Sequence, residues 1–237
     1  MRVLQLWRYP VKSLQGEQLD SVPVTANGIE GDRQFAIFDA ETGFGLTARR
    51  EPELLYATAQ LREDGGVAIT LPDGSIADDD RALSTWLGRR VNLRSTAEDT
   101  TRRYENVVDF EHEKVSRWEP FNGGHGAFHD AQGANVSLMS TATIGGWERR
   151  RFRSNVILDG NDEESFLKSR VALGEALLDV GMRIKRCVMV TRPQPGDVQR
   201  DLDVLRSIHR ERNGFLAVGA TVARQGTVTV GDRLQKA

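Results

Sequence analysis

Cys187 is the side chain with the widest chemical range in this sequence, because it is the only cysteine among the 237 residues. Lys185 and Arg186 precede it, and a neighbouring cation favours the thiolate, the form that attacks electrophiles and ligates metals. The stretch from Ile184 to Val190 has the apolar composition of a strand, in which an unpaired cysteine is more often a small buried hydrophobe. A single cysteine excludes an internal disulfide and a cysteine-based zinc or iron–sulfur centre within the chain. Cys187 is therefore a candidate nucleophile or metal ligand, with a buried structural thiol as the alternative.

Three further stretches carry cations in positions that suit an anionic ligand. Lys12 and Ser13 end a proline-containing segment and present an ammonium group beside a hydroxyl, a pair that suits phosphate. The turn Asn27–Arg33 returns a guanidinium toward a strand, and the arginine-rich run Arg149–Asn155 precedes another strand. The planar fork of a guanidinium binds phosphate or carboxylate through two parallel hydrogen bonds. The alternatives are solvated loops with surface ion pairs for the first two stretches, and a charged helix-to-strand link for the third.

Other common catalytic patterns find little support. His125 and His129 stand four residues apart, but their glycine-rich surroundings predict a loop and argue against a helical zinc site. The sequence contains no Gly-x-Gly-x-x-Gly pattern, no phosphate-binding P-loop and no Gly-x-Ser-x-Gly elbow. Dinucleotide, nucleoside triphosphate and serine-hydrolase chemistry are therefore not indicated.

The composition is typical of a soluble globular protein, with 39% hydrophobic and 28% charged residues and a formal net charge of −2. Because there is no basic excess, we expect no nucleic-acid partner. No apolar run approaches the roughly 20 residues of a transmembrane helix, and Gln5 and Arg8 interrupt the N-terminal segment before a secretory apolar region forms. We therefore expect a cytoplasmic protein that does not act at a membrane.

The elements that must position these side chains are mostly short strands. Alternating apolar residues between turn-forming pairs predict strands over 3–8, 31–39, 67–71, 152–158, 215–222 and 227–230, and two strand-like pieces around Gly181 within 171–192. Acidic caps and helical spacing predict short helices over 81–87, 137–147, 162–169 and 201–212. Residues 95–135 are irregular and rich in glycine, histidine and charge, which predicts long functional loops. Many short strands of this kind favour small barrels.

In their order along the chain, the chemically interesting stretches resemble a known family. The N-terminal ones resemble the β-barrel domain that accompanies MOSC domains, and they are Tyr9-Pro10-Val11-Lys12-Ser13, Gly28-Ile29-Glu30-Gly31-Asp32-Arg33 and Leu46-Thr47-Ala48-Arg49-Arg50-Glu51-Pro52. The C-terminal ones resemble the MOSC domain itself, and they are Arg151-Phe152-Arg153-Ser154-Asn155, Arg186-Cys187 and residues 226–231. The resemblance covers nearly the whole chain. Its relatives are bacterial MOSC proteins and the mitochondrial amidoxime-reducing component, which bind molybdenum cofactor and reduce N-hydroxylated compounds.

The resemblance implies a mainly β, α+β fold of two β-barrel-like domains with a few short helices, an N-terminal domain over 1–95 and a MOSC domain over 96–237. It implies a molybdenum-cofactor-binding oxidoreductase that reduces small N-hydroxylated or N-oxide compounds. Electrons would come from a separate protein, a reductase or a ferredoxin, because this chain lacks the thiols for a ferredoxin-like domain. The alternative is a carrier of molybdenum cofactor or sulfur that acts with a pyridoxal-phosphate-dependent sulfurase. A third possibility is a binding barrel without a cofactor.

The resemblance also assigns residues. It implies that the Cys187 thiolate ligates molybdenum, with Arg186 as the usual preceding residue, and that Asp130 lies near the metal in a catalytic position. It implies that the cofactor is held by Lys12, Ser13, Arg33, Arg153 and Asn155, with Ser140 as a weaker candidate. Three features depart from the family pattern. Ile184 stands where many relatives have a second cysteine. Ser154 replaces the usual proline, and the segment after Cys187 lacks the common motif, so substrate identity does not follow from the resemblance.

Overall fold

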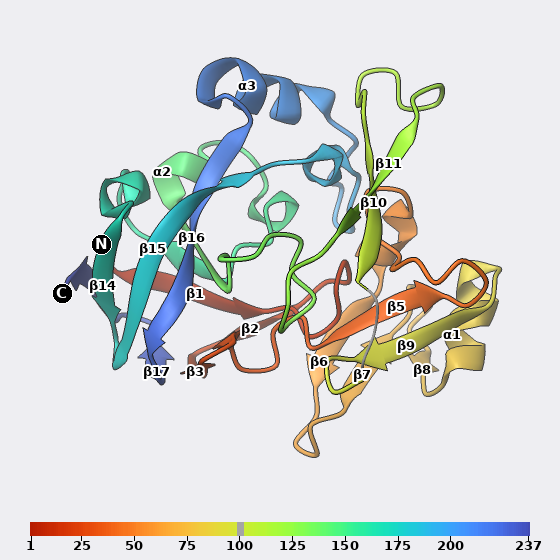
Figure 1. Cartoon of the computed structure of the whole chain (residues 1–237), viewed down its shortest axis with the longest axis horizontal. Helices are drawn as coiled ribbons and strands as arrows, with labels where there is room; N and C mark the ends of the chain where they lie inside the picture. The colour runs from red at the N-terminus through yellow and green to blue at the C-terminus, as the bar shows by residue number, and fades with distance from the viewer. Residues whose placement is uncertain (99–101) are drawn as a thin grey trace.

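The computed structural model describes residues 1–98 and 102–237, and its largest element is an eight-stranded sheet (Figure 1). The strands in spatial order are β18 (Leu234–Lys236), β14 (Ser169–Leu173), β15 (Ala176–Lys185), β16 (Phe215–Arg224), β12 (Val136–Ser140), β13 (Val156–Leu158), β1 (Val3–Arg8) and β2 (Glu17–Leu19). Neighbouring strands are antiparallel except β12 and β13. A small sheet of β17 (Gly226–Thr229), β3 (Ser21–Thr25) and β4 (Gly28–Ile29) lies beside them. The first strands of the chain therefore pair with strands formed more than a hundred residues later.

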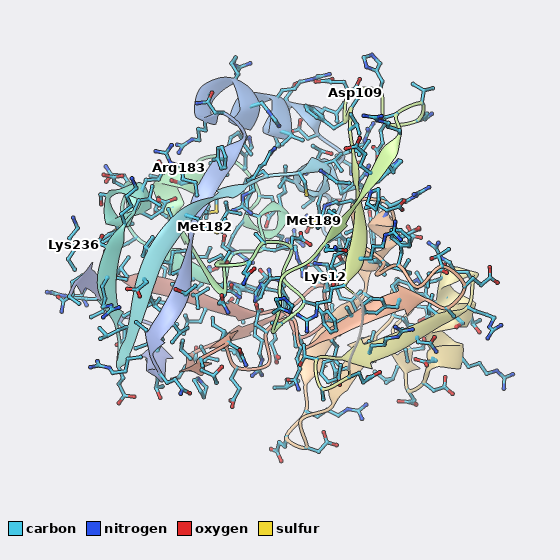
Figure 2. The ribbon with its side chains drawn as sticks, viewed as in Figure 1. Lys12, Asp109, Met182, Arg183, Met189 and Lys236 are labelled. Atoms are coloured by element: carbon cyan, nitrogen blue, oxygen red, sulfur yellow. The ribbon has the colours of Figure 1, made fainter. Side chains whose placement is uncertain are left out.

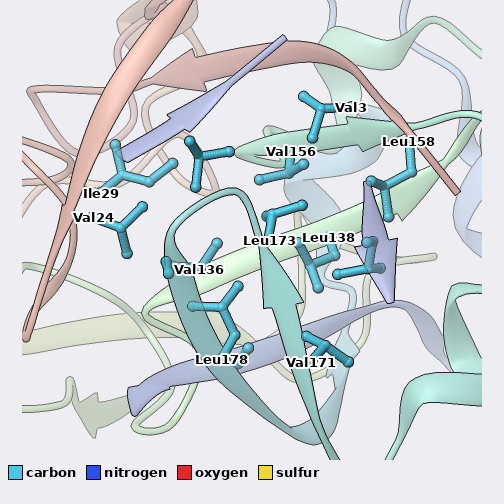
Figure 3. Close-up of a cluster of buried hydrophobic side chains, with 14 of the residues drawn as sticks. Val3, Val24, Ile29, Val136, Leu138, Val156, Leu158, Val171, Leu173 and Leu178 are labelled. Carbon is cyan, nitrogen blue, oxygen red and sulfur yellow. The ribbon is translucent and has the colours of Figure 1, made fainter. Parts of the chain in front are cut away.

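Aliphatic side chains from these strands form one continuous core (Figure 3). Val3, Leu138, Val156, Leu173 and Leu178 are all buried in it. Burial of each such side chain is worth about 1.5–3 kcal/mol, so this cluster is a principal stabilising element of the larger half of the molecule.

The smaller half of the molecule is built from short strands and one helix. It contains the pair β5 (Phe35–Asp39) and β9 (Val91–Ser95), the sheet β6 (Thr58–Leu61), β7 (Val67–Thr70) and β8 (Ile76–Ala77), the 3₁₀ turn η1 (Pro52–Tyr56) and helix α1 (Asp80–Leu87). Asp79 caps α1 by accepting a hydrogen bond from the Ala82 amide, and Gly88 ends the helix in the left-handed conformation. Leu14, Leu54 and Leu83 belong to the separate core of this half.

A hairpin of β10 (Arg103–Val107) and β11 (Trp118–Asn122) stands between the two halves and forms its own two-stranded sheet. The remaining elements are helices α2 (Thr141–Ile144) and α3 (Leu202–Arg212) and the 3₁₀ turns η2 (Arg149–Arg151), η3 (Glu163–Phe166) and η4 (Val188–Thr191). The prediction of a mainly β fold with a few short helices is confirmed. The predicted domain boundary near residue 95 stays a prediction. Among the described residues, no helix has the length and apolar character needed to cross a lipid bilayer.

Three predicted elements were wrong. Residues 95–135 contain the β10–β11 hairpin, which the sequence showed only as irregular and charged. The predicted helix over 137–147 is strand β12 followed by one turn of α2, because the whole of β12 is buried between β13 and β16 and shows no alternation. The strand predicted through Cys187 ends at Lys185, and the chain then turns into η4. In each case tertiary contacts override the local pattern.

Candidate functional site

A cavity of about 520 Å³ lies where the smaller half, the hairpin and the large sheet meet. Eight of the nine predicted site residues line it: Lys12, Ser13, Arg33, Asp130, Arg153, Asn155, Arg186 and Cys187. They come from loops separated by up to about 175 positions in the sequence. Figure 2 shows Lys12 and Met189, two of the lining residues, near the centre of the molecule. Ser140 is the exception and does not line this cavity.

Cys187 lies at the point where β15 has ended and η4 begins, and its side chain is partly exposed. Because the chain leaves the strand at Lys185, Arg186 and Cys187 do not point to opposite faces as strand neighbours would, and both line the cavity. Arg49 approaches the sulfur from the smaller half of the molecule. Although burial opposes its charge, Asp130 and the Cys187 sulfur raise the pKa of Arg49 above its ordinary value. A thiolate at Cys187 would therefore have guanidinium charge close by.

Arg33 and Arg153 face each other across the cavity wall and share one aromatic ring. Their guanidinium carbons lie 5.2 and 4.3 Å from the centroid of the Tyr9 ring. Arg33 pairs with Asp32 and donates to the Arg153 carbonyl at 3.2 Å. Arg153 donates through Nη1 to the Leu14 carbonyl, and no carboxylate among the described residues pairs with it. Burial, reinforced by the charge of Arg33, lowers the pKa of Arg153 to about 10, so the group stays charged at neutral pH.

Arg186 is held by two carbonyls and is likewise without a carboxylate. Its Nε donates to Leu216 O and its Nη1 to Phe152 O, both at 2.9 Å. Burial lowers the pKa of Arg186 to about 10, with the Cys187 sulfur acting in the opposite direction. These bonds aim the guanidinium firmly, since two of its three nitrogens are engaged by the backbone.

The backbone at three cavity residues adopts the left-handed conformation that side chains other than glycine rarely occupy. The φ angles are 71° at Ser13, 50° at Arg33 and 53° at Arg153. Such conformations cost of order 1–3 kcal/mol each, and they gather at sites where side chains must be presented in one direction. All three residues were predicted to hold the cofactor.

Lys12, Arg49 and Asp130 form a compact ionic cluster that lines the cavity. The Lys12 Nζ lies 2.5 Å from Asp130 Oδ1 and donates to Phe128 O at 2.9 Å, and Arg49 pairs with the other carboxylate oxygen. Burial by itself would raise the pKa of Asp130, but Arg49 and Lys12 hold it well below its usual range. Burial lowers the pKa of Lys12 to about 8, against the pull of Asp130. Asp130 is therefore a fixed negative charge, whereas Lys12 is the group able to exchange a proton near neutral pH.

The remaining predicted polar residues have structural partners. Asn155 accepts hydrogen bonds from the Ser137 amide and hydroxyl and donates to the Trp7 carbonyl, which ties β1 to β12 beneath the cavity. The Ser13 hydroxyl oxygen accepts from the Ala48 amide at 3.0 Å. Ser140 is fully buried and caps α2 by accepting from the Thr143 amide. It ends β12, and its hydroxyl is engaged with Thr143 at the start of α2, away from the cavity.

Two residues at the site were missed as site residues by the sequence analysis. Arg49 was quoted only as part of a motif, yet it contacts Asp130 and lies beside the Cys187 sulfur. His129 lines the cavity, and burial together with Arg33 lowers its pKa to about 4, so the ring is neutral at pH 7. The signal available for Arg49 was its position within Leu46–Pro52. No local signal distinguished buried His129 from exposed His125.

The arginine run before β13 serves a purpose that its composition did not predict. Arg151 donates to the carbonyls of Val190, Arg192 and Gln199 at 3.2, 3.2 and 2.7 Å, and Arg150 donates to that of Pro195 at 2.8 Å. Both side chains therefore hold the loop that follows Cys187. Only Arg153 of this run, together with Asn155 and Phe152, faces the cavity.

Unpartnered buried nitrogens test whether the cavity suits the implied cofactor. Arg153 Nη2, Arg186 Nη2, Arg49 Nε and His129 Nε2 are buried without a hydrogen-bond partner among the described residues. A buried donor without a partner costs about 1–3 kcal/mol, more when it is charged, so the three guanidinium donors around one cavity indicate that an acceptor-rich ligand belongs there. A phosphorylated pterin with a sulfur-bound metal has that character, and the residues present fit it.

Apolar side chains also line the cavity, and they are Phe121, Pro120, Met189, Phe215 and Ala131. Apolar side chains beside fixed charges suit an organic substrate that carries one polar reacting group. Arg33, Arg153 and Arg186 form what we call the cationic cradle. The cavity thus combines this cradle with one partly exposed sulfur and several apolar side chains.

Comparisons with known proteins show the family of this chain. Residues 1–117 match the family model described as the MOSC N-terminal beta barrel domain, and residues 126–235 match the MOSC domain. Among curated proteins, the molybdenum cofactor sulfurase of Drosophila grimshawi is 25% identical over 94% of this chain and 32% of its own length. That of Drosophila mojavensis is 23% identical over 99% of this chain and 33% of its own length, so the chain spans about a third of these relatives. A solved structure, the YuaD protein of Bacillus subtilis, matches with a TM-score of 0.43 and 13% identity over 98% of this chain and 93% of that one.

Proposed function

We propose a function from one established premise: this chain belongs to the MOSC family. The proposal is that it binds molybdenum cofactor in the central cavity and reduces small N-hydroxylated or N-oxide compounds, with Cys187 as the protein ligand of the metal. The observation that carries it is the convergence of the chain's only thiol with unpartnered, buried guanidinium nitrogens of Arg49, Arg153 and Arg186 on one cavity. A cytoplasmic location and a separate electron-donor protein belong to the same proposal.

The cationic cradle has a defined task in this function. Arg33, Arg153 and Arg186 would hold the phosphate and pterin of the cofactor, and each charge-assisted hydrogen bond is worth about 1.5–3 kcal/mol. Their guanidinium groups are already aimed by backbone carbonyls, so little side-chain freedom is lost on binding. When bound, the cofactor supplies a centre that changes its oxidation state by two electrons as oxygen leaves the substrate.

Cys187, Asp130 and Lys12 would act on the metal, the substrate and its proton. Soft thiolate sulfur at Cys187 is a suitable ligand for a metal of this kind. Asp130 would hold a fixed negative charge, because Arg49 and Lys12 keep it ionised. Lys12, with a pKa near 8, is better suited than Asp130 to deliver a proton from Nζ to a departing oxygen. The apolar side chains of Phe121 and Met189 would exclude water from the organic part of the substrate.

A test of the ligand assignment uses elemental analysis. The full chain is produced in a host that makes molybdopterin, and molybdenum per chain is compared between the wild type and Cys187→Ala, with the exposed Asp179→Asn as the matched control. We expect most of the molybdenum to be lost only from Cys187→Ala, because that substitution removes the sulfur ligand. Equal molybdenum in all three proteins would exclude Cys187 as the ligand.

A second candidate function is suggested by the curated relatives, which are described as molybdenum cofactor sulfurases. This chain would then carry molybdenum cofactor, or sulfur as a persulfide on Cys187, and act with a pyridoxal-phosphate-dependent sulfurase. Reduction of benzamidoxime by the metal-loaded protein with an artificial electron donor distinguishes the two functions. A reductase turns over the substrate, whereas a carrier shows no turnover and instead releases cofactor or sulfur to an acceptor.

A further inference from the structure

The hairpin β10–β11 forms one wall of the cavity and is joined to the smaller half mainly through side chains, among them the Arg50–Glu105 ion pair and Arg50 over the Trp118 ring at 5.1 Å. Asn106, Glu119, Pro120 and Phe121 of the hairpin face the cavity. Its two strands pair only with each other, and in the part of the chain that the structure describes, a backbone hydrogen bond joins them to the smaller half only at Gly45 N→Arg103 O. A two-stranded hairpin is marginally stable by itself, so side-chain contacts must decide its position.

The base of the hairpin is held by aromatic packing. Tyr104 is fully buried, and its ring centroid lies 6.5 Å from that of Phe38 and 5.7 Å from that of Phe121. Lys12 Nζ lies 4.3 Å from the centroid of the same ring. Aromatic contacts of this kind are insensitive to moderate salt. The base around Tyr104 is therefore the part of the hairpin about which the rest would rotate.

The tip of the hairpin is held mainly by ion pairs to the other half of the molecule. Glu113 pairs with Arg192, with one contact of 2.8 Å, and lies 3.6 Å from Arg200. Glu111 receives hydrogen bonds from Arg206 on α3, with Nε at 2.8 Å from Oε1. Phe110 adds one aromatic contact, because its ring stacks on His209 at 5.5 Å. Figure 1 shows this tip reaching toward α3.

Arg192 connects this tip to the residues around the thiol. Its side chain is only 7% exposed, and it ends η4, the turn that begins after Cys187. The Nη2 group that pairs with Glu113 also donates to the backbone carbonyl of Arg49. The position of the tip is thus coupled through one buried guanidinium to both sides of the sulfur.

We propose that the hairpin β10–β11 is a gate over the cavity, which pivots at Tyr104 and is latched by Glu111 and Glu113 on Arg206 and Arg192. In the latched state, Asn106, Glu119 and Pro120, which lie on the tip side of the Tyr104–Phe121 pair, close this part of the cavity wall. Release of the latch swings the wall outward and admits large molecules to Cys187. The Glu111–Arg206 pair is partly exposed and is therefore weakened by salt, which shifts the hairpin toward the open state, whereas the buried Glu113–Arg192 pair is screened much less. The inference rests on the contacts of the hairpin and does not depend on the proposed function.

The single thiol makes the gate measurable in the full chain without any cofactor. We would measure the rate of Cys187 alkylation by a polyethylene-glycol maleimide and by N-ethylmaleimide, and take the ratio of the large reagent to the small one. The ratio reports access, because any change in the reactivity of the sulfur itself affects both rates alike. The expected result for the wild type is a low ratio that rises with sodium chloride.

Variants locate the latch. Glu113→Gln is expected to raise the ratio about tenfold, because it breaks the buried pair with Arg192, and Glu111→Gln is expected to raise it less. The matched control is Asp179→Asn, which removes an exposed pair with Arg170 on β14 and β15 and should leave the ratio unchanged. A ratio in Glu113→Gln equal to that of the wild type would overturn the gate. If Glu113→Gln does not fold, a ratio that is flat with salt in both the wild type and Glu111→Gln overturns it equally.

Discussion

Buried arginines that line the cavity differ from Arg192, which lies beside it, in whether a carboxylate of the protein neutralises their charge. Arg153 and Arg186 are 5% and 8% exposed and have carbonyls but no carboxylate as partners. Arg192 is equally buried, at 5%, but is paired with Glu113. A buried charge needs a counter-charge, which the protein supplies for Arg192 and which, under the proposed function, the cofactor would supply for the other two.

This difference separates the buried charges that the protein neutralises itself from those that an anionic ligand would neutralise. The Glu113–Arg192 pair is complete without a ligand. The cradle around Arg153 carries its positive charge at a cost to stability, which an anionic ligand would relieve. Four predictions test this contrast.

The largest effect is expected at Arg192, the arginine paired with a carboxylate. Arg192→Gln should lower the free energy of unfolding by about 3–5 kcal/mol, because Glu113 would be left partly buried without its partner. Urea unfolding of the cofactor-free protein measures this. A variant as stable as the wild type would show that the pair contributes nothing and would weaken the contrast.

The next effect concerns protonation of His129, which lines the cavity. Burial, and then Arg33, lower the pKa of His129 to about 4, below its ordinary 6.5. As pH falls from 6.5 to 4 the unfolded chain binds a proton that the folded chain does not, so stability falls by up to about 3 kcal/mol in this window and is fully retained above it. Unfolding curves across this window should show a shallower slope for His129→Gln. The exposed His125→Gln should keep the wild-type slope.

A smaller effect, of different character, is expected at the unbalanced arginine. Arg153→Gln should leave the free energy of unfolding of the cofactor-free protein within about 1 kcal/mol, because the lost contacts are offset by relief of a buried charge. The same variant should bind cofactor about ten- to a hundredfold more weakly, which corresponds to the loss of about 1.5–3 kcal/mol. Molybdenum retained after dialysis measures the second part. A loss of stability as large as that of Arg192→Gln would refute the distinction.

The smallest effect is expected at the exposed ion pair of the hairpin tip. Glu111→Gln should leave the midpoint of urea unfolding almost unchanged, because both partners of the Glu111–Arg206 pair are solvated. The same variant still changes the access of large reagents to Cys187 if the hairpin is a gate. A large drop in the midpoint would show instead that the tip is an integral part of the fold.

Much of the site was predictable because its residues stand in short motifs. Lys12-Ser13, Arg33, Arg153 and Arg186-Cys187 were identified through their place in the family pattern, and all line the cavity. Strand β1 and helices α1 and α3 followed from local periodicity, which local burial preserves.

Other parts of the site had no local signal. The hairpin strands contain Glu105, Pro120 and Asn122, and only their mutual pairing and the cavity behind them make them strands. Ser140 stood near the right motif, but the burial of β12 turned it toward α2.

Residue types and short-range order alone determined that this chain has one thiol, several anion-binding arginines and many short strands. Only the tertiary structure decided which arginines are balanced. Arg192 meets a carboxylate 79 positions away and a carbonyl 143 positions away, whereas Arg153 meets a carbonyl 139 positions away and no carboxylate. The physical reason is that charge balance is set by distance in space, and the chain brings these groups within bonding distance only when its two cores and the hairpin have packed together.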